Sequence, residues 1–272
     1  MIIKHLARAV IPSPLRPSAK RVYRLLKRRN QPRFDPSVLQ CRVAYNVHGG
    51  YCVPLSSRHL PMVQAILAGE VFEPETIEFL ESYPGAGDLV HAGAFFGDFL
   101  PALSRSRRAS AKVWAFEPNF ESYRCASITL AINNLSNVEL ANAALGDRDE
   151  TGFLMVRNLN GLSLGSTSRV LDRAEKVAIS ERNVQVIRLV KLDSVIPTNV
   201  HVSAIHLDVE GYETDALNGA RNIIRQCRPV IIVETMPNPE WLSNNLWPLG
   251  YRIGPKIHYN TVLIHRDGPP NR

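Results

Sequence analysis

Residues 206–213 read HLDVEGYE and place a histidine and three acids within eight positions. An apolar run precedes them, so these side chains stand where a buried strand would end. Charged groups are seldom buried without partners, which favours a polar site. We predict Asp208 and Glu210 as catalytic residues, because a carboxylate at such a site can accept a proton. His206 is the third candidate, since alternate strand residues face opposite sides of a sheet. The alternative is a helix N-terminus at which acids complement the helix dipole.

A second stretch, HAGAFFGD at residues 91–98, contains two glycines four residues apart. Gly93 permits a tight turn, and Gly97 allows the following helix to pack closely. This pattern predicts a backbone loop that a cofactor can approach. Structural turns also produce this spacing, so the loop alone does not identify a ligand.

An acid follows the next apolar run, in the sequence FEPN at residues 116–119. Glu117 lies 24 residues after Gly93, close to the spacing of about 20 for an acid that binds ribose hydroxyls. A carboxylate suits this role because it accepts two hydroxyl hydrogen bonds at once. The alternative is a residue that only neighbours a helix N-cap. Together with the glycine loop, Glu117 predicts nucleoside binding.

Alternating strands and helices must position these residues. Strands are expected at 89–92, 112–116, 138–141, 201–207, 229–233, 252–253 and 261–264, and helices at 96–106, 120–133, 214–226 and 239–246. A β-rich insertion is expected at 152–196. Such alternation predicts a doubly wound, Rossmann-like α/β fold with a mainly parallel sheet. Ligands bind such sheets at the carboxyl ends of the strands.

Three segments are expected along the chain: a basic arm at 1–33, a small extension at 34–84 and a catalytic domain at 85–272. The extension reads as a strand pair within 43–54 and helices at 59–68 and 74–82. The PGAG run at 84–87 marks the start of the domain.

Positive charge is concentrated in the arm. The whole chain has a net charge of +7, yet residues 1–33 hold ten Lys or Arg and no acid. The remaining chain therefore has 22 basic and 25 acidic residues. A solvated arm is the simplest interpretation, and peripheral contact with an anionic membrane is the main alternative. Nucleic acid is not expected, because no interleaved aromatic residues or binding motif accompany the charge.

Cysteine spacing bears on metals and location. The four cysteines form no CxxC pair and no zinc-ligand pattern, which favours reduced thiols in a cytoplasmic protein. A peripheral location at the inner membrane face is the alternative that the basic arm suggests. Asp208, Glu210 and Glu234 could bind a metal ion, but no ligand spacing requires one, so no metal is predicted.

Three stretches resemble the FkbM-type methyltransferases: AGAFFGDF, VWAFEPNFESYRCASITLAINNLSNVELANAALGD, and HLDVEGYETDALNGA followed by RPVIIVE. The resemblance covers about residues 70–236 and implies a class I methyltransferase sheet that binds S-adenosylmethionine. It implies cofactor contacts from Gly93, Ala94, Gly97, Glu117, Asn119, Asn142 and Ala143. It also implies that Asp208–Gly211 lies beside the transferred methyl group.

The chain departs from this family at two positions. His91 stands where the family usually has Asp, and Phe95 where it usually has Asn. Both positions lie near the methionine end of the cofactor in the family. We expect His91 to act as a neutral substitute and Asp98 to supply the displaced charge. The alternative is weakened cofactor binding, or a non-catalytic relative.

The resemblance implies O-methylation of a hydroxyl on a sugar, a glycolipid or a secondary metabolite. Acceptor recognition is expected from residues 40–80 and 158–182, where the alternation of strands and helices is less regular. A nicotinamide-dependent oxidoreductase on the same sheet is the second hypothesis. It requires a GxGxxG turn, which residues 93–97 do not supply. A binding protein with a degenerate site is the third.

Overall fold

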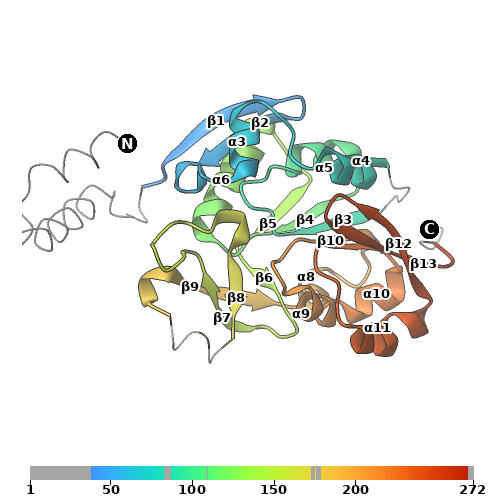
Figure 1. Cartoon of the computed structure of the whole chain (residues 1–272). Coiled ribbons are helices and arrows are strands. Elements are labelled where there is room, and N and C mark those ends of the chain that lie inside the picture. The colour runs from blue at the N-terminus through green and yellow to red at the C-terminus, as the bar shows by residue number, and fades with distance from the viewer. Residues whose placement is uncertain (1–37, 83–86, 109, 173–174, 176–178, 269–272) are drawn as a thin grey trace, which may run out of the picture. The chain divides into compact units, whose positions relative to one another are not determined.

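The computed structural model describes residues 38–82, 87–108, 110–172, 175 and 179–268 (Figure 1). The basic arm and residues 84–86 of the PGAG run lie outside this range. The chain divides into two units, Met1–Val38 and Leu39–Arg272, and the second is described here.

Strands and helices alternate through most of this unit. The strands are β1 (Cys41–Asn46), β2 (Gly49–Pro54), β3 (Asp88–Ala92), β4 (Val113–Phe116), β5 (Val138–Ala141), β6 (Ala144–Leu145), β7 (Glu150–Met155), β8 (Arg169–Leu171), β9 (Val184–Val190), β10 (Val202–Leu207), β11 (Val230–Val233), β12 (Tyr251–Ile257) and β13 (Asn260–His265). The α-helices are α3 (Pro61–Leu67), α4 (Pro74–Ser82), α5 (Leu100–Ser106), α6 (Phe120–Asn133), α8 (Leu192–Val195), α9 (Glu213–Asn218), α10 (Arg221–Cys227) and α11 (Pro239–Asn245). The short 3₁₀ helices are η2 (Leu55–Ser57), η3 (Gly165–Thr167), η4 (Glu181–Asn183) and η5 (Trp247–Leu249).

The central sheet has the strand order β12-β13-β11-β10-β3-β4-β5. Strands β11, β10, β3, β4 and β5 run parallel, whereas β13 is antiparallel to both of its neighbours. The chain moves outward from β3 to β4 and β5, then returns to the other side of β3 with β10. Ligands bind at such a reversal of strand order. The predicted doubly wound α/β fold is confirmed.

Helices cover both faces of this sheet (Figure 1). Val90 and Ala92 pack with α9, α10 and α11 on one face. Leu89 packs with α4 and α5 on the other. Burial of each large aliphatic side chain contributes about 1.5–3 kcal/mol, so the two layers fix the position of the strands.

Five strand ends are aligned at one edge of the sheet. Ala92, Phe116, Ala141, Leu207 and Val233 are linked through successive register pairs. The residues that directly follow them are Gly93, Glu117, Asn142, Asp208 and Glu234. Parallel pairing therefore brings four polar residues and one glycine into a row, although 141 positions separate its first and last members.

A second sheet, ordered β6-β9-β7-β8, is inserted between β5 and β10. The β-rich insertion was expected from residue 152, but this sheet already begins at β6. Strand β6 has only two residues, and so short a strand shows no alternating pattern in the sequence. The start of the insertion was therefore predicted too late.

The extension packs against α6. Main-chain atoms of Gly50 exchange hydrogen bonds with the Asn133 side chain, and Cys52 N donates to Thr129 Oγ1 at 3.0 Å. The β1–β2 hairpin is therefore attached to a helix of the central fold. The predicted strand pair and both predicted helices are present, with α4 at the expected residues.

The prediction of a single helix at 214–226 is wrong in one respect, because the chain forms two helices there, α9 and α10. A Cβ at Gly219 would lie 2.0 Å from the carbonyl oxygen of Gly146, so the chain at this point passes directly against another backbone segment. Asp193 accepts hydrogen bonds from the main-chain N–H groups of Asn222 and Ile223, both at 3.0 Å. A cap supplied by a distant residue thus starts the second helix.

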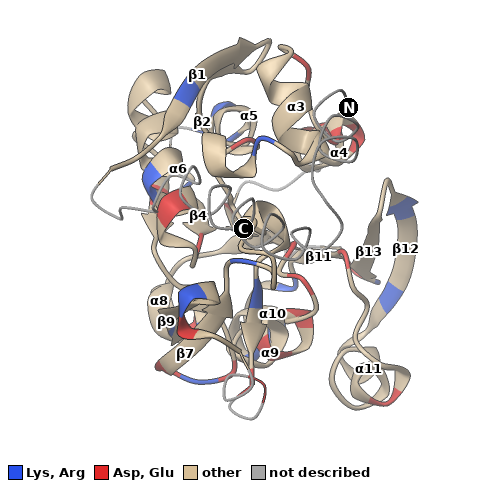
Figure 2. Cartoon of the chain, turned by 60° about the vertical axis from the view of Figure 1, so that its left-hand side comes forward, with Lys and Arg blue, Asp and Glu red and all other residues tan. Residues whose placement is uncertain are grey.

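Charged residues of this unit are spread over many elements (Figure 2). Among the described residues, no helix combines the length and apolar character needed to cross a membrane.

Candidate active site

A cavity of about 270 Å³ lies at the carboxyl edge of the central sheet, where the strand order reverses. Its lining includes seven of the predicted site residues: His91, Gly93, Asp98, Glu117, Ala143, Asp208 and Glu210. It also includes Glu73 and Glu234, so six carboxylates surround it. No lysine or arginine is among the described residues of the lining. The site is therefore suited to a cationic or neutral ligand.

The glycine loop passes directly against β10. A Cβ at Gly93, where φ is +88°, would lie 1.8 Å from the carbonyl oxygen of Asp208. Only glycine fits this backbone conformation and this close approach. The main-chain N–H groups of Gly93 and Ala94 both donate to Phe116 O at 3.0 Å, which ties the loop to the end of β4.

Glu117 is buried beneath this loop. Its Oε2 accepts from Phe95 N and its Oε1 from Asn119 N, both at 2.7 Å. Burial nevertheless raises the pKa of Glu117 to about 8, opposed by these two bonds and assisted by Asp98. Each carboxylate oxygen keeps a lone pair for a ligand hydroxyl.

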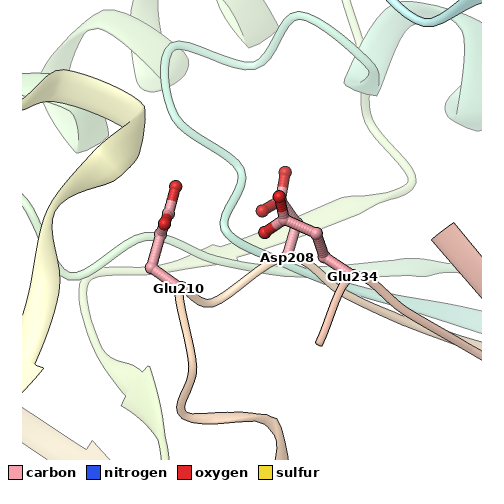
Figure 3. A group of neighbouring side chains, drawn as sticks. All are labelled: Asp208, Glu210 and Glu234. Atoms are coloured by element: carbon pink, nitrogen blue, oxygen red, sulfur yellow. The ribbon is translucent and has the colours of Figure 1, made fainter. Parts of the chain in front are cut away.

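Three acids that follow the ends of β10 and β11 lie close together, with Asp208 beside Glu234 (Figure 3). Oxygen atoms of Asp208, Glu210 and Glu234 all lie within 4.8 Å of one another. Burial raises the pKa of Glu210 to about 7, with a further contribution from Glu234. Burial and the neighbouring acids raise the pKa of Asp208 well above its usual value. Such a group can accept protons near neutral pH, and its spacing also suits a divalent cation.

Backbone strain is concentrated at this cavity. Six residues other than glycine have positive φ among those described. Asn134 and Arg228 end helices, and His258 lies in the β12–β13 turn. The other three, Glu73, Phe95 and Glu210, all line the cavity, at φ values of +47°, +44° and +54°. Strained residues of this kind cluster at functional sites.

Asp98 is buried just before α5. Burial raises its pKa to about 7, and the negative charge of Glu73 adds to the effect. The N-cap position belongs to Phe99, and no side-chain capping bond forms there. Asp98 is thus a buried carboxyl that a cation in the cavity could stabilise.

His91 and His206 are neighbours in register on β3 and β10. Their Nδ1 atoms lie 2.9 Å apart, and their ring planes are 4° from parallel. Phe99 stacks on both rings. Burial lowers the pKa of His91 well below its usual value and that of His206 to about 4, so both rings are neutral. His91 lines the cavity, whereas His206, a predicted catalytic candidate, does not.

Four further predicted residues lie near the cavity without lining it. Asn142 Nδ2 donates to the carbonyl oxygens of Glu117 and Pro118 at 2.8 and 3.1 Å. The Asn119 side chain caps α6 by accepting from Glu121 N. These two residues fix the loop that carries Glu117. Ala94 and Gly97 shape the glycine loop through a bond of 2.7 Å between Gly97 N and Ala94 O.

Several lining residues were not named one by one from the sequence. Glu73 comes from the extension, Ser166–Ser168 from the insertion and Tyr259 from the β12–β13 turn. Glu73 and Ser166–Ser168 lie within the ranges expected to bind the acceptor, whereas Tyr259 lies outside every predicted site range. The positive φ at Glu73 has no signal in the sequence.

The extension and the insertion meet over the cavity. Ser57 Oγ and Ser163 Oγ are 3.2 Å apart. A Cβ at Gly165 would lie 2.7 Å from atoms of both Leu60 and Ser57, so η3 packs tightly on this part of the extension. We call residues 57–62 together with 163–168 the roof of the cavity.

Comparison with solved structures gives similar chains at low sequence identity. An FkbM methyltransferase from Methylobacillus flagellatus is 19% identical, with a TM-score of 0.45, and aligns over 65% of this chain but only 43% of that one. A SAM dependent methyltransferase from Aquifex aeolicus is 13% identical over 85% of this chain and 97% of that chain, with a TM-score of 0.41. M. jannaschii TYW2 in complex with AdoMet is 12% identical over 83% and 84%, with a TM-score of 0.45.

Comparison with sequences is more specific. No curated protein sequence matches the chain significantly. Residues 91–252 match the family described as the Methyltransferase FkbM domain, and this match covers more than half of the chain. It begins at His91 and includes every strand end of the aligned row. The chain therefore belongs to the FkbM methyltransferase family.

Proposed function

We propose that this chain is an S-adenosylmethionine-dependent O-methyltransferase. Its proposed acceptor is a hydroxyl group of a sugar, a glycolipid or a secondary metabolite. One observation carries the proposal: the aligned strand ends bring Gly93, Glu117 and Asp208 to the same cavity. The row thus places Glu117, the acid proposed to bind the nucleoside, at the same cavity as Asp208, a candidate base for an acceptor hydroxyl.

The residues of the cavity fit this cofactor. Glu117 would accept hydrogen bonds from the ribose hydroxyls through its free lone pairs. Phe116, Ala143 and Leu154 offer an apolar surface for the adenine ring on the β4–β5 side. The sulfonium and ammonium groups would then lie towards the polar side, and the six carboxylates favour these positive charges.

S-adenosylmethionine would supply a methyl group that its sulfonium makes electrophilic. Asp208 or Glu210 would accept the acceptor's hydroxyl proton as the oxygen forms its new bond to the methyl carbon, while the sulfur–methyl bond breaks and S-adenosylhomocysteine leaves. A carboxylate whose pKa is near 7 can hold that proton at neutral pH and still be ionised beforehand. Such a base typically accelerates a reaction about 10²–10⁴-fold.

The roof supports acceptor recognition by segments outside the sheet. Leu60, Met62 and Thr167 line the cavity and belong to the ranges expected to bind the acceptor. Their side chains can also shield the reacting atoms from water, which strengthens the electrostatic interactions of the carboxylates.

Cofactor identity is tested by thermal-shift titration of the full chain with S-adenosylmethionine, NAD and NADP. A ligand that binds only the folded chain at 100 times its Kd stabilises it by about 2.7 kcal/mol. We expect this stabilisation with S-adenosylmethionine alone. A response to NAD or NADP instead would favour an oxidoreductase, and no response to any of them would favour a degenerate site.

Acceptor identity is tested by mass spectrometry of a hydroxyl-compound library incubated with the chain and labelled S-adenosylmethionine. Asp208→Asn and Glu210→Gln should lower kcat while S-adenosylhomocysteine still binds. Turnover that persists in EDTA supports the base role. Loss of turnover that Mg²⁺ restores would instead assign Asp208, Glu210 and Glu234 to a metal ion.

A further inference from the structure

The cavity contains a buried carboxyl group without a counter-charge. Asp98 is 6% exposed and lines the cavity, yet its side chain forms no ion pair and no hydrogen bond with another described residue. His91, which also lines the cavity, is no counter-charge, because burial lowers its pKa well below its usual value. An ionised carboxylate in such a place needs a cation. Asp98 therefore indicates that a ligand brings a cationic group to this part of the cavity.

A second carboxylate reaches the cavity from the extension. Glu73 directly precedes α4, and its Oε2 accepts hydrogen bonds from Thr76 Oγ1 and Asn260 Nδ2, both at 3.0 Å. Asn260 Nδ2 also donates to Thr76 Oγ1 at 3.3 Å, so the three side chains hold one another in place. Both bonds to Glu73 use the same oxygen. Oε1 has no hydrogen-bond partner among the described residues and is left for a ligand.

The main chain fixes this carboxylate as well. Glu73 has a φ of +47° and precedes Pro74, and both the left-handed conformation and the proline disfavour this backbone. Its carbonyl oxygen accepts from Thr76 N at 3.1 Å. The ring of Phe72 packs edge-on against His258 of the β12–β13 turn, with 6.5 Å between the centroids. Contacts from α4 and from this turn therefore hold Glu73 in a strained conformation at the cavity wall.

The location of Glu73 indicates which part of the cofactor it would meet. Asn260 is the first residue of β13, and the next residue, Thr261, pairs with Val233 at the end of β11. The Glu73 carboxylate therefore lies at the β11 end of the row, and β10 and β3 separate this end from Glu117 after β4. With the ribose on Glu117 and the adenine ring on the β4–β5 side, the methionine portion extends towards Glu73.

We propose that Glu73 is a cofactor-binding residue, whose Oε1 accepts a hydrogen bond from the ammonium group of the cofactor together with the carboxylate of Asp98. This inference rests on the proposed function. An ammonium group has three N–H donors and can bind two carboxylates at once. Hydrogen bonds between ionised groups are about twice as strong as those between neutral groups. The extension thus completes the cofactor site that the strand ends begin.

The contact is tested by calorimetry of the full chain with three nucleosides. S-adenosylhomocysteine has the ammonium group, its deaminated analogue keeps the carboxylate but lacks the ammonium group, and methylthioadenosine lacks both. Glu73→Gln should weaken S-adenosylhomocysteine binding about 10- to 100-fold, the range for a hydrogen bond to a charged group. It should leave methylthioadenosine binding unchanged, and it should not weaken binding of the deaminated analogue, because a repulsive charge is removed.

Glutamine suits this test because its side-chain oxygen can still accept from Thr76 and Asn260, so the substitution removes the charge and keeps the anchoring bonds. Glu75→Gln is the matched control. Glu75 is an exposed acid in the first turn of the same helix and does not line the cavity. This variant should bind all three nucleosides as the wild-type chain does.

The outcomes separate binding from a structural role. An equal loss for all three nucleosides would show that Glu73 only stabilises the start of α4, and it would overturn the proposal. Unchanged binding of S-adenosylhomocysteine to Glu73→Gln would also overturn it. Failure of the wild-type chain to bind any of the three nucleosides would instead reject the proposed function, and this inference with it.

Discussion

Asp98 combines burial, a raised pKa and a place in the cavity lining, without a capping role at α5. We predict that Asp98→Asn weakens S-adenosylhomocysteine binding by about 1.5–3 kcal/mol, because a cation loses a charged partner. The melting temperature of the free chain should stay the same or rise, since a buried charge is removed. Parallel calorimetry and thermal melts check this. A lower melting temperature with unchanged affinity would indicate that Asp98 only stabilises the helix start, worth about 0.3–1 kcal/mol.

Burial raises the pKa values of Asp98 and Glu210 to about 7 and that of Glu117 to about 8, so proton binding is coupled to ligand binding. In the ligand-free chain these three groups stabilise the folded state in their protonated form, and this stabilisation is complete below the ordinary carboxyl pKa of about 4. It is lost as the pH rises through about 7 to 8.

The ammonium group of S-adenosylhomocysteine favours ionised Asp98 and Glu210, and its ribose hydroxyls favour ionised Glu117 as a hydrogen-bond acceptor. We therefore predict proton release on binding S-adenosylhomocysteine at pH 7, and an affinity that rises between about pH 6 and 8. Calorimetry in buffers of different ionisation enthalpy measures the released protons. Glu117→Gln should release fewer. Proton uptake on binding, or an affinity that falls over this range, would contradict the binding of this ligand by ionised carboxylates.

Residues directly after apolar runs could be predicted from the sequence. Glu117 and Asp208 each follow a strand that forms part of the sheet, so their position in the row follows from parallel pairing. The pairing of His91 with His206 could not be predicted. It depends on the register of β3 with β10, which joins residues 115 positions apart.

At the scale of elements, the loop between β3 and α5 makes the closest backbone approach of the site. We predict that Gly93→Ala destabilises the chain and abolishes cofactor binding. Its Cβ would meet Asp208 O at 1.8 Å in addition to the strain of positive φ. Gly161→Ala is the matched control, because Gly161 has a φ of +78° and no atom within 4 Å of the added Cβ.

The control should cost about 1–2 kcal/mol in the free energy of unfolding, the penalty for a left-handed residue with a side chain. Gly93→Ala should cost about 1–3 kcal/mol more, as overpacking does. Chemical denaturation measures both values. Equal costs for the two variants would show that the loop can move away from β10.

The elements themselves were predicted unevenly. Helix α6 begins after Asn119 and ends at an αL cap at Asn134, and both signals are local, so its bounds could be predicted. The division between α9 and α10 could not, because Gly146 and Asp193 cause it from other parts of the chain. Distant packing of this kind leaves no periodic pattern in the sequence.

At the scale of the whole molecule, the basic arm lies outside the described residues and its role stays a prediction. Deletion of residues 1–33 should lower binding to anionic vesicles and leave turnover of a water-soluble acceptor unchanged. Each Lys or Arg near such a surface contributes about 1 kcal/mol, and ten are present. Vesicle sedimentation at low and high salt checks this, with uncharged vesicles as the control. Both forms remaining in the supernatant with anionic vesicles at low salt would exclude the membrane role.

The reversal of strand order between β3 and β10 has a consequence for synthesis on the ribosome. Strand β4 emerges soon after β3 and can pair with one side of it, but His91 and His206 are 115 residues apart. At about 5–20 residues per second, this separation corresponds to about 6–23 s of translation. During that interval the central strand of the future sheet has an unpaired edge, which other chains can join. Translation speed between β5 and β10, including the whole inserted sheet, therefore sets how long the nascent chain is exposed to aggregation.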